Sequence, residues 1–387
     1  MKLLFLCASV EPGRDGVGDY TRRVATECAA RNHEAAIVAL NDEHSAGASD
    51  ENDDGVRILR LSRDLSWKER ISRTIARVTD VGPDWTSWQF VPYGYHPKGL
   101  SQPALLDLAS ALGRARGHIM FHELWNDLAI GESTRLKLIG WMQRRGILKF
   151  LKHLAPVLVH TSNEAYAAVL TRENYHARVL PLFGNVPIAA APSPVCRAKT
   201  LSFLPAPQPL EDRGGDPFFI GVTFGTLHPQ WKSEATAAWM RKTAAELGRQ
   251  PALLISGRAG ANAVIVKTVF SNAGIATVET GEQDANTIST ILQGADIGIV
   301  SSPWALVGKS GAASAMRDHG LPVVVPRDDW RLQKGPISGP PRDSLLARLA
   351  DLATPEATLR WLALRQAPRS RLSPVVDDFL GQLEKAR

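Results

Sequence analysis

The sequence predicts an α/β protein built from two doubly wound domains, each a mostly parallel sheet with helices on both faces. Segments with strand and helix patterns alternate along the first half of the chain and again along the second half, an order typical of parallel sheets. The chain has 387 residues, more than the roughly 250–300 at which a single hydrophobic core stops growing. A proline-rich stretch separates the two series, so we expect the domain boundary there.

The first series of elements fills the N-terminal half. Short apolar runs predict strands, and helical periodicity predicts helices. The expected elements are strand 2–8, helix 19–31, strands 34–40 and 56–61, helix 67–79, strand 84–91, helix 103–112, strand 118–122, helix 136–154, strand 157–161, helix 163–173 and strand 178–183. The segment 41–54 is rich in Asp, Glu, Ser and Gly, so we expect an acidic surface loop there.

The second series follows a stretch, 184–216, in which prolines accumulate. Its expected elements are strand 217–224, helix 233–247, strand 252–256, helix 261–273, strand 275–279, helix 286–294, strand 297–301, helix 310–318, strand 322–326, and helices near 355–366 and 374–385. The predicted division is a Rossmann-like domain over 1–186, a linker over 187–216, a second Rossmann-like domain over 217–353, and helices over 354–387 that brace the two domains.

Composition narrows the class of protein. Hydrophobic residues make up 44% and charged residues 22%, as in ordinary globular chains. The net charge of +6 favours anionic small molecules or acidic surfaces, and we find no nucleic-acid motif. No apolar run approaches the roughly 18 residues of a membrane span, and the opening residues 1–7 are expected to form a strand rather than a signal peptide. The three cysteines show no metal-ligand spacing, and a reducing cytoplasm is the expected location.

The strongest basic feature is the segment 137–152, where lysines and arginines interleave with apolar residues. Such a pattern is typical of a helix that lies on a membrane surface. We favour the alternative, a helix that packs on the core and exposes a charged face, because ordinary surface helices carry such stripes. Both interpretations stay open, so peripheral contact with the inner membrane face is an expectation of the sequence.

The segment 296–325 is the most informative part of the chain, because it predicts a strand, a loop, a short helix and a buried strand. Gly308, Lys309, Ser310 and Gly311 lie where the helix should begin. A helix start presents free backbone N–H groups and the positive end of the helix dipole, and Lys309 adds a full charge. This turn is therefore predicted to bind an anion, most naturally a phosphate.

Two alternatives apply to this turn. A P-loop would need a glycine five residues before Gly308, and Pro303 stands there. The other alternative is structural, since Gly308 and Gly311 could simply permit close helix packing while Lys309 is solvated.

A second glycine-rich loop follows the first strand, with Gly16 and Gly18 opening directly onto a helix. Backbone without side chains can approach a ligand closely there. A dinucleotide site would need a third glycine at Thr21 and a tighter turn, although Asp42 after the second strand could hold a ribose. A merely permissive turn is the remaining alternative.

Together these segments resemble GT-B glycosyltransferases, in particular the retaining family-four (glycosyltransferase group 1) type. The segments that carry the resemblance are 16–34 with its glycine loop, Phe121-His122-Glu123, Phe183-Gly184-Asn185-Val186-Pro187, Phe224-Gly225-Thr226-Leu227, and 303–322 followed by Val323-Val324. The resemblance spans most of the chain. It implies two Rossmann-like domains that face one another across a cleft, with the acceptor bound by the N-terminal domain and the donor by the C-terminal one.

The chain departs from the family at the donor-binding positions. The family usually presents two glutamates with seven residues between them, and the matching positions fall near Leu306 or Val307 and near Ser314 or Ala315. The basic residue expected after Phe224-Gly225 is replaced by Thr226, and Lys232 lies one place later than the usual lysine. The resemblance thus implies a donor-diphosphate site made of Gly225, Thr226, Lys232, Gly308, Lys309, Ser310 and Gly311.

The remaining site residues also follow from the resemblance. His122 matches a histidine that hydrogen-bonds the donor sugar, so His122 and Lys309 are the predicted catalytic residues, although a histidine at a strand end is often structural. The predicted acceptor side comprises Gly16, Val17, Gly18, Asp19, Tyr20, Gln89, Tyr93, His96 and Glu123. We expect Trp85, Trp88 and Phe90 to pack in the core or at an interface.

The predicted function is transfer of a hexose from a nucleoside-diphosphate sugar to a hydroxyl acceptor, with retention, in glycan, glycolipid or small-molecule biosynthesis. No metal or further cofactor is expected. Two alternatives remain: a nucleotide-sugar-binding protein without transfer activity, suggested by the missing glutamates, and a nucleotide-sugar isomerase or hydrolase on the same fold. The base, the sugar, the acceptor, the linkage and the oligomeric state do not follow from the sequence.

Overall fold

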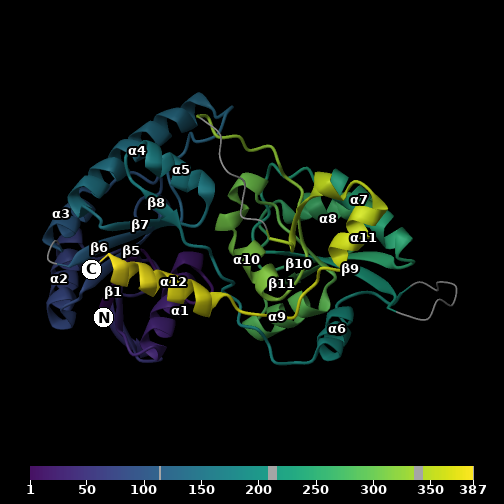
Figure 1. Ribbon diagram of the computed structural model, residues 1–387, viewed down its shortest axis with the longest axis horizontal. Coiled ribbons are helices and arrows are strands. Elements are labelled where there is room, and N and C mark those ends of the chain that lie inside the picture. The colour runs from purple at the N-terminus through teal and green to yellow at the C-terminus, as the bar shows by residue number, and fades with distance from the viewer. Residues whose placement is uncertain (113–114, 208–215, 335–342, 387) are drawn as a thin grey trace. The chain divides into compact units, whose positions relative to one another are not determined.

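The computed structural model describes residues 1–112, 115–207, 216–334 and 343–386. The chain forms two compact units, each with its own sheet (Figure 1). Unit 1 comprises Met1–Pro181, Arg331–Ser338 and Leu372–Arg387, and unit 2 comprises Leu182–Trp330 and Gly339–Arg371.

Within the described residues, unit 1 contains an eight-stranded sheet in the order β3-β4-β2-β1-β5-β6-β7-β8. The strands are β1 (Lys2–Cys7), β2 (Glu34–Asp42), β3 (Ala48–Asp53), β4 (Val56–Ser62), β5 (Trp85–Phe90), β6 (Arg116–Phe121), β7 (Leu158–Thr161) and β8 (Ala177–Val179). The pairings are parallel except that of β3 with β4, which confirms the predicted α/β class.

The helices of unit 1 cover both faces of this sheet. They are α1 (Gly16–Ala30), α2 (Trp67–Val81), the short 3₁₀ helix η1 (Pro92–Gly94), α3 (Pro103–Ala111), α4 (Thr134–Leu154), α5 (Glu164–Arg172) and α12 (Leu372–Lys385). Phe150 of α4 packs on Trp88 and Phe90 of β5, while Phe379 of α12 packs on the other side against Phe5 and His118. As expected, Trp88 and Phe90 are buried core residues, as is Trp85.

The acidic segment 41–54 was predicted as a loop, and this prediction was wrong for its second half. Residues 48–53 form β3, an antiparallel edge strand joined to β4 by Asp54 and Gly55, both with positive φ. Asp-Gly between two strands is a strong hairpin signal, which the acidic composition obscured. The charges are accommodated because arginines pair with them: Glu51 with Arg22 and Arg60, Asp53 with Arg22, and Asp50 with Arg77.

Unit 2 contains a sheet in which every pairing among the described residues is parallel, in the order β11-β10-β9-β12-β13-β14. Its strands are β9 (Phe218–Phe224), β10 (Gln250–Ser256), β11 (Ala276–Gly281), β12 (Ile297–Ile299), β13 (Val323–Val325) and β14 (Leu346–Arg348). The helical elements are α6 (Ser193–Leu201), α7 (Glu234–Glu246), α8 (Ala263–Asn272), α9 (Ala285–Gly294), the 3₁₀ helix η2 (Trp304–Lys309), α10 (Gly311–Asp318), the 3₁₀ helix η3 (Leu349–Leu352) and α11 (Pro355–Leu362).

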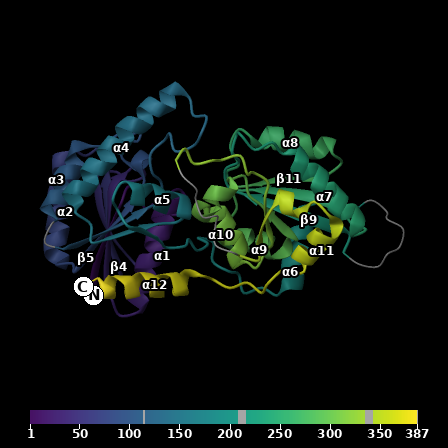
Figure 2. The same cartoon turned by 45° about the horizontal axis from the view of Figure 1, so that its top comes forward.

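Two hydrophobic layers enclose the sheet of unit 2. One contains Met240 of α7 and Phe270 of α8, and the other contains Ile291 of α9 and Met316 of α10. Figure 2 shows α7 and α8 on one side of this sheet and α9 and α10 on the other. Helices on both faces of a parallel sheet leave only its edges for a ligand.

The predicted linker 187–216 is not a free connection, because it contains α6. Pro194 lies in the first turn of α6, where the missing N–H costs nothing. The helix packs closely on α9: a Cβ added to Gly294 would lie 2.1 Å from the hydroxyl oxygen of Thr200. Arg197 of α6 also forms ion pairs with Asp216 and Asp296 of unit 2. The prolines therefore mark a helix start within unit 2.

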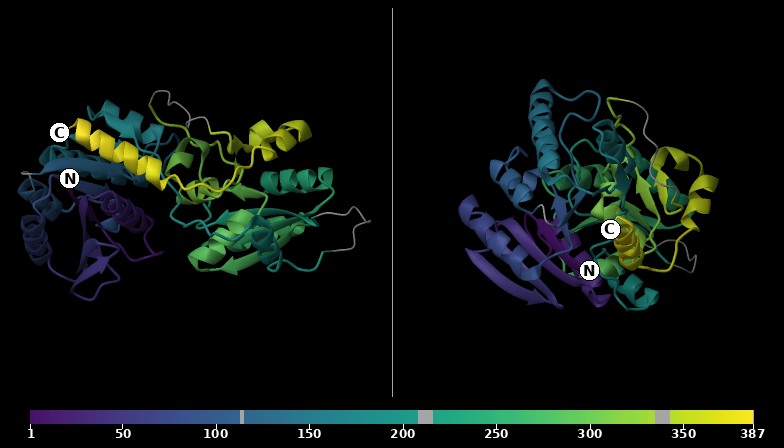
Figure 3. Two further views of the ribbon diagram at one scale, coloured as in Figure 1. Left: turned by 60° about the horizontal axis from the view of Figure 1, so that its bottom comes forward. Right: turned by 60° about the vertical axis from the view of Figure 1, so that its left-hand side comes forward.

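The C-terminal helices belong to different units, and the predicted group 354–387 divides accordingly. Helix α11 packs beside α7 in unit 2, where the indole N–H of Trp239 donates to Thr358. Helix α12 packs on α1 in unit 1, where Arg31 forms an ion pair with Asp377. Figure 3 follows the chain from α11 to α12 and shows α12 ending near the N-terminus.

Candidate functional site

The turn at residues 308–311 in unit 2 starts a helix, as predicted. Ser310 is the N-cap of α10, and its hydroxyl oxygen accepts a hydrogen bond from the backbone N–H of Ala313 at 3.2 Å. Gly308, Lys309 and Ser310 are partly exposed and Gly311 is exposed. The first N–H groups of α10 therefore begin at the surface of unit 2, where an anion could reach them.

Arg327 lies beside the start of η2, the 3₁₀ helix that leads into this turn, and the sequence did not indicate it. Its carbonyl oxygen accepts from the N–H of Trp304 at 2.8 Å, and its guanidinium donates to the Ser301 carbonyl at 3.3 Å. The guanidinium also donates to both carboxylate oxygens of Asp329, at 3.1 and 2.9 Å, and is only 5% exposed. The one signal that could have indicated Arg327 as a site residue is its position just after the strand β13.

His228 completes a basic cluster at this edge of the sheet. Its backbone N–H donates to the Ser301 hydroxyl at 2.9 Å. Partial burial and the charges of Arg327 and Lys309 lower the pKa of its imidazole, while Asp329 acts in the opposite direction. Asp329 pairs with Arg327, and Lys309 and the start of α10 add positive potential near His228.

The other predicted donor residues are placed differently. Gly225 has φ 80° after β9, which favours glycine, and its N–H donates to the Ser256 carbonyl at 3.0 Å. Thr226 is exposed and leads into His228, so this loop joins the basic cluster. Lys232 is exposed and lies just before α7.

In unit 1 the structure brings His122 together with Tyr20 and Gln89. His122 follows β6 and is buried, with its ring edge-to-face against Tyr20 at a centroid distance of 4.9 Å. Its Nε2 lies 3.0 Å from Oε1 of Gln89. Three predicted residues from α1, β5 and β6 thus meet at one edge of the sheet.

A continuous chain of hydrogen bonds begins at His122, continues through Gln89 and ends on α12. The successive pairs are His122–Gln89 at 3.0 Å, Gln89–Ser87 at 2.9 Å, Ser87–His118 at 2.8 Å, His118–His160 at 3.0 Å, His160–Gln382 at 2.9 Å and Gln382–Asp378 at 3.0 Å. No pattern in the sequence connects residues of β5, β6, β7 and α12 in this way.

The Asp378 end of this hydrogen-bond chain determines the tautomer of each histidine. The amide NH₂ of Gln382 donates to the Asp378 carboxylate, so its oxygen must accept from Nε2–H of His160. Each imidazole then accepts at Nδ1 and donates at Nε2, and His122 donates Nε2–H to Gln89. Nδ1 of His122 is left as a hydrogen-bond acceptor.

Burial keeps these imidazoles neutral. It lowers the pKa of His118 and His160, and it lowers the pKa of His122 to about 3. A group with this pKa is a poor general base near neutral pH. His122 can therefore accept a hydrogen bond from a ligand hydroxyl without taking its proton.

The glycine loop before α1 is held by carboxylates. Asp15 caps α1 by accepting from the N–H groups of Val17 at 2.8 Å and Gly18 at 3.2 Å, and Asp19 accepts from Gly13 at 2.9 Å. A Cβ on Gly18 would lie 2.6 Å from the carbonyl oxygen of Ser9, whereas Gly16 has open space around it. Gly18 therefore serves close packing, and Gly16 leaves the surface of the loop open.

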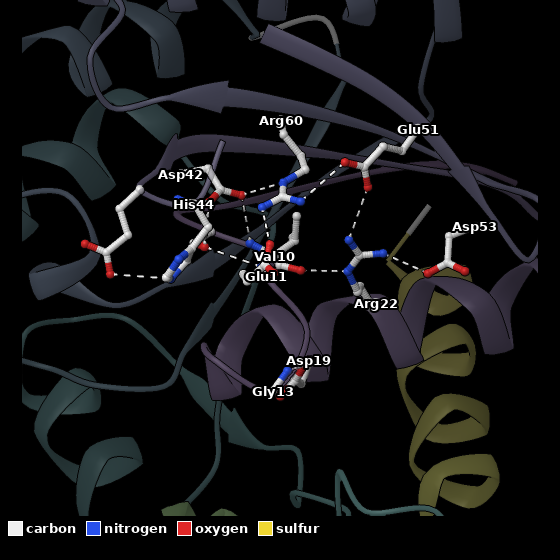
Figure 4. A network of polar contacts seen from close by, with 12 residues as sticks. Val10, Glu11, Gly13, Asp19, Arg22, Asp42, His44, Glu51, Asp53 and Arg60 are labelled. Atoms are coloured by element: carbon white, nitrogen blue, oxygen red, sulfur yellow. Dashed lines mark hydrogen bonds and ion pairs between the residues drawn. The ribbon is translucent and has the colours of Figure 1, made fainter. Parts of the chain in front are cut away.

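Asp42 is unavailable for the ribose of a dinucleotide. Figure 4 shows its carboxylate facing Arg60, whose Nε donates at 2.9 Å, and the backbone N–H groups of Val10 and His44. Burial raises the pKa of Asp42, but the hydrogen bonds from Arg60, His44 and Val10 and the charge of Arg60 together outweigh burial and lower it. The dinucleotide alternative is thus contradicted, because the acidic residue that it requires is fully buried and bonded within unit 1.

Tyr93 and His96, two predicted acceptor residues, form hydrogen bonds with residues other than His122. Tyr93 in η1 is 42% exposed, and its hydroxyl oxygen accepts from the side chains of Asn126 at 2.7 Å and Gln143 at 3.2 Å. Nδ1 of His96 accepts from the Lys98 N–H at 3.0 Å and so closes its own turn. Glu123 is half-buried next to His122.

Solved structures similar to this chain identify its fold. HepE from Anabaena, solved in complex with UDP, superposes with a TM-score of 0.57 at 12% identity over 100% of both chains. Sucrose-phosphate synthase from Thermosynechococcus elongatus gives a TM-score of 0.57 at 13% identity over 100% of this chain and 98% of that one. WaaG, a glycosyltransferase involved in lipopolysaccharide biosynthesis, gives 0.53 at 11% identity over 97% and 94%.

The chain has the GT-B fold. The fold implied by the sequence resemblance is therefore confirmed. No protein-family model matches the sequence, and no curated protein matches it in a sequence search. No helix in the described part of the chain is long and apolar enough to cross a membrane. Across residues 1–112, 115–207, 216–334 and 343–386, no three His, Cys, Asp or Glu side chains are grouped to hold a metal ion.

The depressed pKa of His122 predicts a pH dependence of stability. The unfolded chain binds a proton on this histidine below its ordinary pKa of about 6.5, whereas the folded chain does so only near pH 3, so stability falls as the pH drops between these values. His122→Gln should remove about 1 kcal/mol of the stability difference between pH 6 and pH 5. Urea unfolding at both pH values measures this difference, and an unchanged difference would mean that His122 is already charged in the folded protein.

Proposed function

We propose that the protein is a glycosyltransferase that moves a hexose from a nucleoside-diphosphate sugar to a hydroxyl acceptor, with retention, in glycan, glycolipid or small-molecule biosynthesis. The observation that carries the proposal is the start of α10, where Lys309 precedes the Ser310 cap and His228 and Arg327 lie alongside. The GT-B fold supports it, and so does HepE, which has been solved with UDP and with UDP-glucose.

The chemistry of the transfer explains why such a cluster matters. The bond between the anomeric carbon and the diphosphate breaks, so negative charge grows on the leaving group in the transition state. Lys309 and the N–H groups at the start of α10 would stabilise that charge, because they are fixed in place before the reaction begins. Gly225 and Thr226 would let the backbone after β9 approach the same phosphates.

The proposed role of His122 is to orient the donor sugar. Its Nδ1 would accept a hydrogen bond from a sugar hydroxyl, while the chain of hydrogen bonds to Asp378 holds the opposite nitrogen protonated. In a retaining front-face mechanism the departing phosphate takes the proton of the acceptor. No neighbouring base with a pKa near 7 is then required, which agrees with the neutral state of His122.

A binding protein without transfer activity is the second candidate. The positions that match the missing glutamates, Leu306, Val307, Ser314 and Ala315, are buried and contribute no carboxylate. Release of nucleoside diphosphate from a nucleotide sugar, dependent on an added acceptor, would exclude this candidate.

We place the protein in the cytoplasm, with peripheral contact at the inner membrane face through α4. One face of α4 is core, with Ile147, Phe150 and Leu151 buried, so the packing alternative holds for that side. The opposite face exposes Leu138 together with Lys137, Arg145, Lys149 and Lys152. Basic residues around an exposed apolar side chain suit an anionic lipid surface. The free, buried cysteines Cys7, Cys28 and Cys196 suit a reducing compartment.

The diphosphate site is tested by calorimetric titration with uridine, guanosine, adenosine and thymidine diphosphates. Lys309→Ala should weaken the tightest of these by roughly tenfold or more, the value of a charge-assisted hydrogen bond. Lys242→Ala is the matched control, since it removes the same charge from an exposed position on α7 outside the predicted site, and it should have the smaller effect. Equal effects of the two changes would mean that the diphosphate does not bind at Lys309.

The membrane contact is tested by co-sedimentation with vesicles. We expect binding to vesicles that contain anionic lipid, weaker binding at high salt, and a clear loss when Lys149 and Lys152 are both changed to Glu. Equal binding to neutral and anionic vesicles would contradict an electrostatic contact through α4.

A further inference from the structure

Unit 1 contains a pocket of about 410 Å³ that none of the predicted site residues line. Its walls come from the loop Trp125–Leu128, from α4, from the end of α5, and from the segment Leu332–Lys334, which returns from a distant part of the sequence. The volume falls within the roughly 300–1,000 Å³ typical of small-molecule pockets.

The loop wall of this pocket is fixed by close packing. Gly140 allows α4 to approach the loop, since a Cβ there would lie 2.3 Å from the Asn126 carbonyl oxygen. Gln143, which is fully buried, accepts from the Asn126 N–H at 2.8 Å. Asp127 adopts a left-handed backbone with φ 64° that aspartate tolerates. Such a wall is formed before any ligand arrives.

A second part of the wall, the segment Leu332–Lys334, is bonded directly to the same loop. The backbone N–H of Gln333 donates to the Leu128 carbonyl at 2.9 Å, and Leu332 pairs with Ala129 in a β-bridge. The side chain of Gln333 donates to the Asp127 carboxylate and to the Ala129 carbonyl. These contacts hold the segment Leu332–Lys334 against the mouth of the pocket.

The charged groups of the lining leave an excess of positive charge. The carboxylate of Glu173 accepts two hydrogen bonds from Arg144, at 2.8 and 2.6 Å, and that of Asp127 accepts from Gln333. Arg172 and Lys334, both exposed, add two further cations. Trp141 is 53% exposed and lines the same pocket, with the guanidinium of Arg145 over its indole ring at 5.0 Å from the centroid.

We propose that this pocket binds a sugar unit that carries a phosphate or a carboxylate, as part of the acceptor. An indole ring packs on the apolar face of a sugar, amide and carboxylate side chains such as those of Asn126 and Asp127 bond its hydroxyls, and guanidinium and ammonium groups hold its anion. Asn126 also contacts the hydroxyl of Tyr93, a predicted acceptor residue, so the pocket continues the predicted acceptor side. The assignment to the acceptor rests on the proposed function.

The test is calorimetric titration of the full-length protein with glucose 6-phosphate, glucuronate, glucose and inorganic phosphate. One or both anionic sugars should bind more tightly than glucose and than phosphate, and which one binds identifies the anion. The double change Arg172→Ala with Lys334→Ala should weaken that binding by roughly tenfold or more. Lys68→Ala, which removes an exposed charge on α2 outside the pocket, is the control and should leave sugar binding unchanged.

The outcomes separate this proposal from the proposed function. Binding of neither anionic sugar, phosphate binding as tight as that of glucose 6-phosphate, or equal effects of the double variant and the control would overturn the pocket assignment. Nucleoside-diphosphate binding is measured on the same proteins. If the double variant loses the sugar but keeps the diphosphate and its melting temperature, the pocket is a separate site. If the sugar binds and no diphosphate does, the pocket stands and the transferase proposal fails.

Discussion

The parallel arrangement of the strands in unit 2 is the constraint on which the rest depends. Because β9, β12 and β13 are parallel neighbours, their carboxyl ends lie at one edge of the sheet, and the loops that follow them must meet there. His228 follows β9, Lys309 and Ser310 follow β12, and Arg327 follows β13. Helices cover both faces of this sheet, so the basic cluster at its edge is the natural place for an anion.

In unit 1 the corresponding constraint is burial. Three histidines in a dry interior stay neutral, and neutral imidazoles can form a directed chain in which each accepts at Nδ1 and donates at Nε2. The carboxylate of Asp378 on α12 sets that direction. At the other end of the hydrogen-bond chain, His122 therefore donates from Nε2 to Gln89. Helix α12 thereby determines that Nδ1 of His122, the nitrogen that a ligand would contact, is a hydrogen-bond acceptor.

The sequence indicated the elements whose signals are local. Gly308–Gly311 at a strand-to-helix junction predicted the start of α10, and alternating apolar segments predicted both sheets. The errors came where composition competed with a local signal, as with Asp54-Gly55 inside an acidic segment and Pro194 at the start of α6. Arg327 and the links through Ser87, His118 and Gln382 depend on which strands become neighbours, and no local pattern reports that.

The central claim is that the start of α10 holds the diphosphate of a nucleotide sugar. Its most direct test follows the backbone amide resonances of Gly311 and Ala312 in deuterated protein during titration with a nucleoside diphosphate. These amides should shift strongly and saturate at the calorimetric affinity, while amides at the start of α8 stay unchanged. Saturable binding that leaves Gly311 and Ala312 unmoved would contradict the account.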